Sequence, residues 1–258
     1  MNDRLVTSAS SATTIAAIVP AAGVGSRMQS EKPKQYLRIA GQTILQHSLQ
    51  ALLADARIKH IFLALAADDA YFERLELPEH WPITTVVGGD CRAASVAAGI
   101  AAAAAAGYQY VAVHDAARPC LAVAELSAVL DAGIAHPHGA ILAVPVVDTL
   151  KRSQTSSASS SRPAEIAQTV ARNGLWQAQT PQVFRTDVLQ QALQRLGVDH
   201  PSLTDEASAL EQNGMTPQLV AGSPRNLKVT SPADLALAEL FLMHAGTTLA
   251  SQHSKGNG

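Results

Sequence analysis

The chain has 258 residues and lacks the features of several common protein classes. Its two cysteines, Cys91 and Cys120, form no Cys-x-x-Cys pattern, which argues against a structural zinc site and suits a reducing, cytoplasmic environment. No run of about 18 strongly apolar residues is present, so we expect no membrane span. The formal net charge of -2 gives no sign of a basic, nucleic-acid-binding surface across the chain as a whole.

What the chain does contain is an alternation of apolar strand and helix patterns, with 47% hydrophobic residues overall. The predicted strands are Ile15 to Val19, Ile61 to Leu65, Ile83 to Val87, Tyr110 to His114 and Ala140 to Val147. The predicted helices are Thr43 to Leu53, Asp90 to Ala106, Leu121 to Ala135, Arg185 to Leu196, Asp205 to Gln212 and one that begins at Ser231-Pro232. Continuous apolar strands separated by helices predict an α/β fold, with a Rossmann-like, mostly parallel sheet covered by helices on both faces.

The domain boundaries follow from changes in composition. We expect a disordered leader at residues 1–14, one domain over 15–246 and a disordered tail at 247–258. The serine-rich run Ser153 to Ser161 cannot bury apolar area and predicts a flexible tip. The short polar segments on either side of it predict a projecting β-arm at about residues 148–172.

A glycine-rich turn follows the first predicted strand, as Pro20-Ala-Ala-Gly-Val-Gly-Ser-Arg27. Glycines at Gly23 and Gly25 allow a phosphate to approach backbone N–H groups closely. The turn is neither a Walker A loop, because Gly-Lys-Ser/Thr is missing, nor a dinucleotide-binding turn, because Met28 replaces the third glycine. Taken alone it is more typical of a plain tight turn than of a ligand site. Arg27 and Lys34 add two cations, which favours polyphosphate binding over a solvated surface.

Asp115 stands at the carboxyl end of the predicted strand Tyr110 to His114, where ligands gather in parallel sheets. From the residues alone it has three interpretations: a Mg²⁺ ligand, the N-cap of the following helix, or an ion-pair partner of Arg118. Asp90 similarly precedes a helix and is expected to cap it. The neighbouring His114 is expected to be packed in the strand.

Seven ordered motifs beyond the turn give these residues a family context. With Pro33-Lys34-Gln35-Tyr36, the turn is similar to the signature loop of the sugar nucleotidyltransferases. The further motifs are Gly88–Val96, His114–Pro119, Asp148–Lys151, Arg172–Asn173, Gln179–Gln182, Thr204–Ala207 and Asn226–Thr230. Together they resemble the 2-C-methyl-D-erythritol 4-phosphate cytidylyltransferases of the non-mevalonate isoprenoid pathway, over roughly Ile15 to Met243.

The resemblance implies a role for each candidate residue. Arg27 and Lys34 would be catalytic, Arg92 and Arg118 supporting, and Asp115 the ligand of Mg²⁺ or another divalent cation. The implied nucleotide-binding residues are Pro20, Ala21, Ala22, Gly23, Gly25, Gly89, Asp90, Ser95 and Ala116. The implied substrate-binding residues are Thr149, Arg172, Thr180, Thr204 and Lys228, although nothing in their spacing brings them together. The arm would reach a second subunit and complete its site, which makes a homodimer the expected assembly.

The implied reaction joins CTP and 2-C-methyl-D-erythritol 4-phosphate and releases pyrophosphate. The phosphate oxygen of the polyol attacks the α-phosphorus in line, and catalysis consists of positioning and charge stabilisation. One alternative is a cytidylyltransferase for ribitol 5-phosphate, against which Ala117 and Cys120 count. The other is a non-catalytic nucleotide-binding module, against which the joint presence of Arg27, Lys34 and Asp115 counts.

Overall fold

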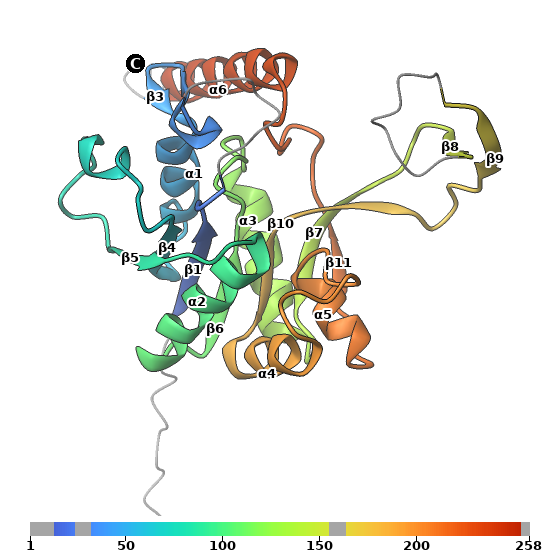
Figure 1. The fold of residues 1–258 in the computed structure, drawn as a ribbon. Coiled ribbons are helices and arrows are strands. Elements are labelled where there is room, and N and C mark those ends of the chain that lie inside the picture. The colour runs from blue at the N-terminus through green and yellow to red at the C-terminus, as the bar shows by residue number, and fades with distance from the viewer. Residues whose placement is uncertain (1–12, 24–31, 155–163, 254–258) are drawn as a thin grey trace, which may run out of the picture.

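The computed structural model describes residues 13–23, 32–154 and 164–253, and within them the chain forms the expected α/β fold (Figure 1). Among these residues the central sheet has seven strands in the order β11-β7-β10-β6-β1-β4-β5. The strands are β1 (Ile15–Pro20), β4 (Ile58–Leu65), β5 (Ile83–Val87), β6 (Tyr110–Val113), β7 (Ala140–Pro145), β10 (Trp176–Arg185) and β11 (Gln218–Ala221). The helices are α1 (Ile44–Leu53), α2 (Arg92–Ala105), α3 (Val123–Ala135), α4 (Thr186–Leu196), α5 (Glu206–Gln212) and α6 (Pro232–His253).

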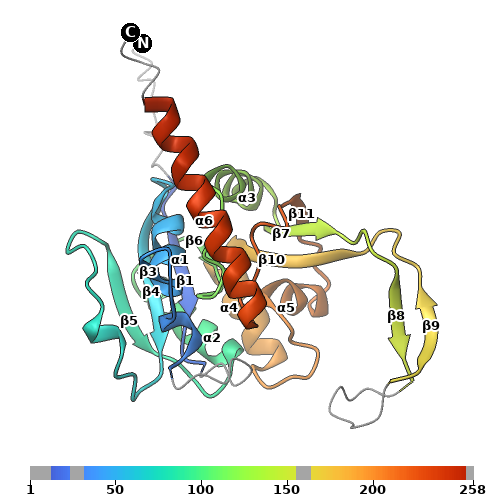
Figure 2. The ribbon, with the colours of Figure 1, turned by 90° about the horizontal axis from the view of Figure 1, so that it is seen from above.

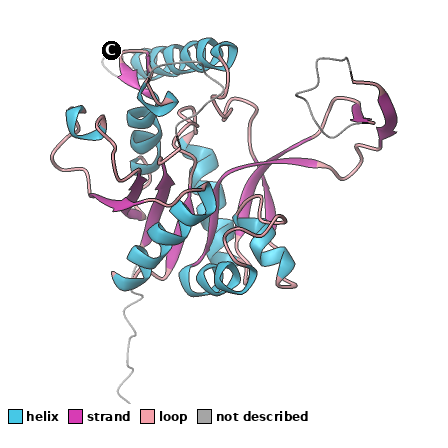
Figure 3. Ribbon diagram, in the orientation of Figure 1, coloured by secondary structure: helices cyan, strands magenta, loops and turns pink. Residues whose placement is uncertain are grey.

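Helices cover both faces of this sheet (Figure 3), because the central strand β1 is apolar on both sides. Ile15, Ala17 and Val19 belong to the core that contains the buried side chains of α1 and α3. Ala16 and Ile18 belong to the other core, with buried side chains of α2, α4 and α5. The period of two along the strand therefore divides the core into two layers and confirms the predicted architecture.

Two strands of the sheet were missed by the sequence analysis, the edge strand β11 and the inner strand β10. β10 lies between β6 and β7 and runs antiparallel to both, while the other strand pairs of this sheet are parallel. Its residues Gln179, Thr180 and Gln182 are polar, so the run lacks the apolar pattern that marks the other strands. Its buried polar side chains reach the site described below, which explains why a central strand tolerates them.

The predicted arm is present as a separate two-stranded antiparallel sheet, β8 (Leu150–Ser153) and β9 (Ile166–Val170). It stands away from the central sheet at the end of long extensions of β7 and β10 (Figures 1 and 2). Most of the serine-rich tip lies at residues 155–163, outside the described residues.

Helix α6 begins as the sequence predicts, with Ser231 Oγ accepting a hydrogen bond from the N–H of Asp234 at 3.3 Å. The helix continues to His253 and so enters the segment 247–258 that was expected to be disordered. Residues Thr247 to Gln252 include no glycine or proline, so nothing in this stretch ends a helix. No helix within the described part of the chain is both long and apolar enough to cross a membrane.

Candidate active site

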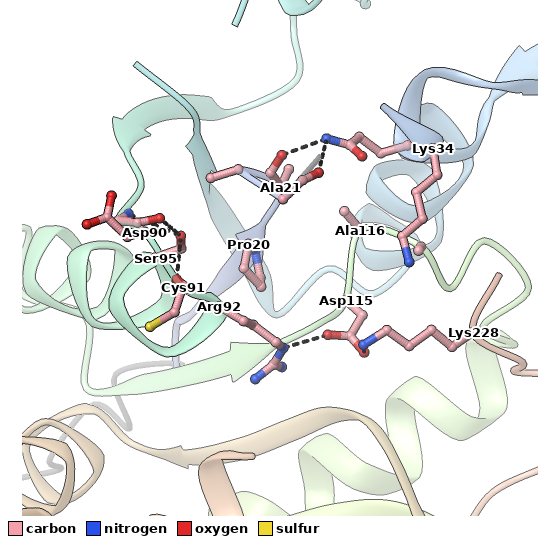
Figure 4. Close-up of a pocket in the computed structure, with 15 residues that line it drawn as sticks. Pro20, Ala21, Lys34, Asp90, Cys91, Arg92, Ser95, Asp115, Ala116 and Lys228 are labelled. Atoms are coloured by element: carbon pink, nitrogen blue, oxygen red, sulfur yellow. Dashed lines mark hydrogen bonds and ion pairs between the residues drawn. The ribbon is translucent and has the colours of Figure 1, made fainter. Parts of the chain in front are cut away.

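A pocket opens at the carboxyl ends of β1, β5 and β6 (Figure 4). Because these strands are parallel, the loops that follow them lie at the same edge of the sheet. Five segments that are separate in sequence line it: the exit of β1, residues 34–35, the turn before α2 with the start of that helix, the turn after β6, and Lys228 before α6. The described lining residues are Pro20, Ala21, Ala22, Gly23, Lys34, Gln35, Gly89, Asp90, Cys91, Arg92, Ser95, Asp115, Ala116, Ala117 and Lys228. Most of the predicted nucleotide-binding residues are therefore neighbours.

The carboxylate of Asp115 is buried in this pocket between three cations. Its Oδ1 accepts a hydrogen bond from Nε of Arg92 at 2.9 Å. Its Oδ2 lies 2.8 Å from Nζ of Lys228 and 3.4 Å from Nε of Arg118. Of the three earlier interpretations, the ion pair with Arg118 is present, and the structure adds Arg92 and Lys228 to it. Figure 4 shows Arg92, Asp115 and Lys228 side by side in the pocket.

The electrostatic consequence is an ionised carboxylate within a surplus of positive charge. Burial alone would raise the pKa of Asp115, but the nearby Arg92, Lys228 and Arg118 outweigh it and hold this pKa well below its usual range. The cluster also contains Glu206, so three cations face two carboxylates before Lys34 is considered. A pocket with this balance favours an anionic ligand such as a phosphate.

A layer of buried polar groups beneath Asp115 fixes its backbone. The N–H of Asp115 donates to Oγ1 of Thr180 at 3.0 Å, and this hydroxyl also lies 3.1 Å from Nδ1 of His114. The other ring nitrogen of His114 lies 3.1 Å from the carbonyl oxygen of Arg118. His114 is fully buried, as predicted, and burial lowers its pKa to about 4. Thr180 is thus a support beneath the pocket rather than a lining residue.

Lys34 and Gln35 enter the pocket from the short helix η2 (Lys34–Tyr36). Nζ of Lys34 donates to the carbonyl oxygen of Val229 at 3.1 Å, which brings it close to the segment that carries Lys228. Nε2 of Gln35 donates to the carbonyl oxygen of Ala21 at 2.7 Å and so fixes the exit of β1. Arg27 and Gly25 lie outside the described residues.

The turn between β5 and α2 forms the opposite wall. Oγ of Ser95, which is buried, accepts from the N–H of Gly89 at 3.2 Å. A Cβ on Gly88 would lie 2.8 Å from this Oγ and 2.7 Å from Cβ of Ala22, so the two walls meet at a glycine. The prediction that Asp90 caps α2 was wrong. The N-cap is Cys91, whose Sγ accepts from the N–H of Ala94 at 3.4 Å, and Asp90 is exposed.

Comparison with known proteins gives this arrangement a family. A family model for 2-C-methyl-D-erythritol 4-phosphate cytidylyltransferase matches residues 15–244. The chain belongs to this family. A protein of that name from Escherichia coli is 51% identical over 228 residues, which are 88% of this chain and 93% of the relative. One from Idiomarina loihiensis is 46% identical over 232 residues, 89% of this chain and 91% of the relative.

Solved structures agree with this membership. A crystal structure of a 4-diphosphocytidyl-2C-methyl-D-erythritol synthase has a TM-score of 0.74 and 34% identity, covering 89% of this chain and 98% of that one. The cytidylyltransferase from Francisella tularensis has a TM-score of 0.72 and 30% identity, covering 88% and 99%. The α/β fold and the cytidylyltransferase family that the sequence motifs implied are therefore confirmed.

Four of the five residues that the family resemblance assigns to the polyol phosphate do not line the described pocket: Thr180, which lies beneath it, and three exposed residues. Thr149 is exposed at the base of the arm. Arg172 is exposed in the loop between β9 and β10, and its Nη1 donates to the carbonyl oxygen of Val147. Thr204 is exposed in a neighbouring pocket that shares Cys91 and Arg92 with the first. Lys228 is the member of this set that lines the pocket, and its Nζ contacts Oδ2 of Asp115.

The donor set allows a metal ion only together with a nucleotide. No group of three or more His, Cys, Asp or Glu side chains in the described ranges is arranged to hold a metal by itself. Two acidic residues, Asp90 and Asp115, are among the described lining residues. Mg²⁺ commonly takes one or two carboxylates and completes its shell with water and phosphate oxygens, so the pocket fits an ion that arrives with a triphosphate. Lys228, whose side chain is 38% exposed, also contacts Oδ2 of Asp115, and an ionised carboxylate has enough lone pairs to serve both partners.

Two contributors beneath the surface were missed by the sequence analysis. Glu206 is buried and holds the guanidinium of Arg92 with both carboxylate oxygens, at 2.7 and 3.1 Å. Asn226 is fully buried. Its side-chain Nδ2 donates to the backbone carbonyl oxygen of Thr180, and its backbone carbonyl oxygen accepts from Nη1 of Arg118 at 2.7 Å. Both lie in motifs that the sequence singled out, but their contacts come from the tertiary fold.

Proposed function

We propose that this protein transfers the cytidylyl group of CTP to 2-C-methyl-D-erythritol 4-phosphate, giving 4-diphosphocytidyl-2-C-methyl-D-erythritol and pyrophosphate for isoprenoid synthesis. One observation supports this most directly. Asp115 holds Lys228 in the same pocket as Lys34, in a chain whose family is named for this reaction. The surplus of positive charge in that pocket suits two phosphorylated substrates.

The chemistry needs positioning more than proton transfer. A phosphate oxygen of the polyol attacks the α-phosphorus of CTP, a new P–O bond forms, and the bond to the β-phosphate breaks as pyrophosphate leaves. The attacking oxygen is already anionic, so no general base is required. Lys34, with Arg27, stabilises the charge on the oxygens around the α-phosphorus. Lys228, with Arg172, holds the attacking phosphate against repulsion from the triphosphate.

Mg²⁺ is part of this proposal, with Asp115 as the residue that would hold it. Bound with CTP, the ion would neutralise charge on the triphosphate oxygens. The support is the ionised carboxylate at the strand end. A dependence of activity on added divalent cation, lost after chelation and restored by Mg²⁺, is the expected result.

A homodimer formed through the arm is also proposed. Thr149 and Arg172 are exposed on the arm's base, away from the pocket of their own chain, so a role for them in substrate binding requires a second subunit. Val147 and Ile166, on the arm and its base, are apolar side chains that are 74% and 61% exposed, and a second subunit would bury them.

A cytoplasmic location belongs to the same proposal and is supported by the free thiols of Cys91 and Cys120.

The test is product formation by the purified protein. With CTP, Mg²⁺ and 2-C-methyl-D-erythritol 4-phosphate, mass spectrometry is expected to find the cytidine diphosphate-linked polyol and an equal amount of pyrophosphate. Ribitol 5-phosphate in place of the methylerythritol compound is expected to give neither. Faster turnover of ribitol 5-phosphate would move the substrate assignment, and CTP binding without turnover of either polyol would favour a binding module.

A further inference from the structure

We infer that Glu206 is a positioning residue for cytidylyl transfer, because it holds Arg92 so that Asp115 keeps one carboxylate oxygen for Lys228. The inference rests on the proposed function, since it assigns Glu206 a part in that reaction. It concerns a residue behind the pocket wall: Glu206 is 2% exposed and does not line the pocket that holds Asp115.

The geometry of the Glu206–Arg92 pair sets the direction of the guanidinium. Nη1 of Arg92 donates to Oε1 of Glu206 at 2.7 Å, and Nη2 donates to Oε2 at 3.1 Å. This bidentate arrangement uses the terminal nitrogens, and it leaves Nε to face Oδ1 of Asp115 at 2.9 Å. Arg92 therefore meets Asp115 through one nitrogen, although a guanidinium is able to cover both oxygens of a carboxylate.

The position of Glu206 is itself fixed by the central sheet. Glu206 begins α5, and Asp205 before it caps the helix by accepting from the N–H of Ser208 at 2.9 Å. Gln182, buried on β10, donates to Oδ2 of Asp205 at 2.8 Å and accepts from the N–H of Ala207 at 3.0 Å. These contacts anchor the start of α5 to the strand beside β6, so Glu206 has little freedom to follow Arg92.

The consequence appears at Lys228. Because Arg92 occupies Oδ1 of Asp115, Oδ2 remains available to Lys228 at 2.8 Å. If Glu206 lost its charge, Arg92 would keep only one strong carboxylate partner, and its paired nitrogens would be drawn to both oxygens of Asp115. Lys228 would then lose the partner that directs it into the pocket. If the ion pair between Glu206 and Arg92 were only structural, its loss would lower the stability of the protein. The binding of each of the two substrates would then stay as it is in the wild type.

The experiment compares Glu206→Gln with Glu211→Gln, an exposed glutamate on the same helix. We expect Glu206→Gln to raise KM for 2-C-methyl-D-erythritol 4-phosphate by about tenfold while KM for CTP changes by less than about threefold, since Lys228 is proposed to hold the polyol phosphate. In a Lys228→Ala background the same substitution is expected to have almost no further effect. Equal changes in both KM values, no change in either, or a full effect without Lys228 would overturn the inference.

Two further measurements keep the inference open to refutation if the variant is unstable or the proposed reaction is wrong. The pair Arg92→Gln with Glu206→Gln removes the guanidinium that would displace Lys228, so it is expected to raise KM for the polyol phosphate less than Glu206→Gln does alone; a rise as large as that of the single variant would contradict the inference. Crystal structures of the wild type and of Glu206→Gln test the geometry without turnover. Arg92 is expected to bridge both oxygens of Asp115 in the variant, with Lys228 beyond hydrogen-bonding distance. An unchanged Asp115–Lys228 contact would contradict the inference, whereas a wild type that fails to turn over CTP would contradict the proposed function alone.

Discussion

Nζ of Lys228 lies 2.8 Å from Oδ2 of Asp115, although the two residues are far apart in the sequence. The contact joins the segment before α6 to the end of β6, and it is reinforced when the N–H of Val229 donates to the carbonyl oxygen of Ala117 at 2.8 Å. Arg92, Arg118 and Lys228 thus share one buried carboxylate, and the first prediction removes its charge.

Replacing Asp115 with asparagine is expected to lower the free energy of unfolding by about 3 kcal/mol, because Arg118 and Arg92 lose a buried counter-charge. Urea unfolding at pH 7 measures this. Asp68→Asn, at an exposed position, is the control and is expected to change stability by less than about 0.5 kcal/mol. An Asp115→Asn protein as stable as the wild type would show that the cluster is solvated rather than buried.

His114 predicts a dependence of stability on pH. Burial lowers its pKa to about 4, whereas an unfolded histidine titrates near 6.5, so the unfolded state binds the extra proton first as the pH falls. The stability contributed by neutral His114 is therefore complete above pH 6.5 and is lost as the pH falls towards 4, by about 3 kcal/mol in total.

The measurement is urea unfolding of wild type and His114→Gln at several pH values between 7 and 4. The variant starts less stable, because its contacts with Thr180 and Arg118 are altered. Its stability is expected to fall less steeply with acid than that of the wild type. Parallel curves for the two proteins would mean that His114 does not titrate differently on folding.

Gly88 separates the two walls of the pocket. A methyl group there would lie 2.7 Å from Cβ of Ala22 and 2.8 Å from Oγ of Ser95, closer than packed atoms normally approach. Gly88→Ala is therefore expected to force the walls apart and raise KM for CTP by about tenfold, at a stability cost of about 1–2 kcal/mol. Thr85→Ala, exposed on β5, is the control. Unchanged CTP binding would show that this wall does not contact the nucleotide.

The arm proposal predicts complementation between two inactive variants. If Arg172 acts on the neighbouring subunit, Arg172→Ala and Lys34→Ala proteins that are unfolded and refolded together form mixed dimers with one intact site. The mixture is expected to recover about one quarter of the wild-type rate. A mixture of Lys34→Ala and Lys228→Ala, which both affect the pocket of their own chain, is expected to recover nothing. No recovery in the first mixture would place Arg172 outside the partner's site.

Much of the fold could be predicted because the strands β1, β4, β5, β6 and β7 are apolar runs and the helices between them carry clear end signals. β10 could not, because its polar residues, such as Gln182, are buried by hydrogen bonds that only the tertiary structure supplies. The cap of α2 was misplaced by one residue, since a cysteine took the role that an aspartate usually fills.

The site shows the same division. The sequence brought Lys34, Asp115 and Lys228 together only through family resemblance, and the fold places them around one pocket. The sharing of Asp115 among three cations, and the hold of Glu206 on Arg92, depend on side-chain directions. No spacing in the sequence encodes these directions.

The most direct test of the account is the rate of pyrophosphate release from CTP and 2-C-methyl-D-erythritol 4-phosphate by the wild type, by Lys34→Ala and by Lys32→Ala. Lys32 is an exposed cation two residues from Lys34 and does not line the pocket. We expect Lys34→Ala to lower kcat by about 100-fold to 1000-fold, because a fixed cation at the reacting phosphorus is lost. Lys32→Ala is expected to stay close to the wild type. Full activity in Lys34→Ala would contradict the assignment of this pocket as the place of cytidylyl transfer.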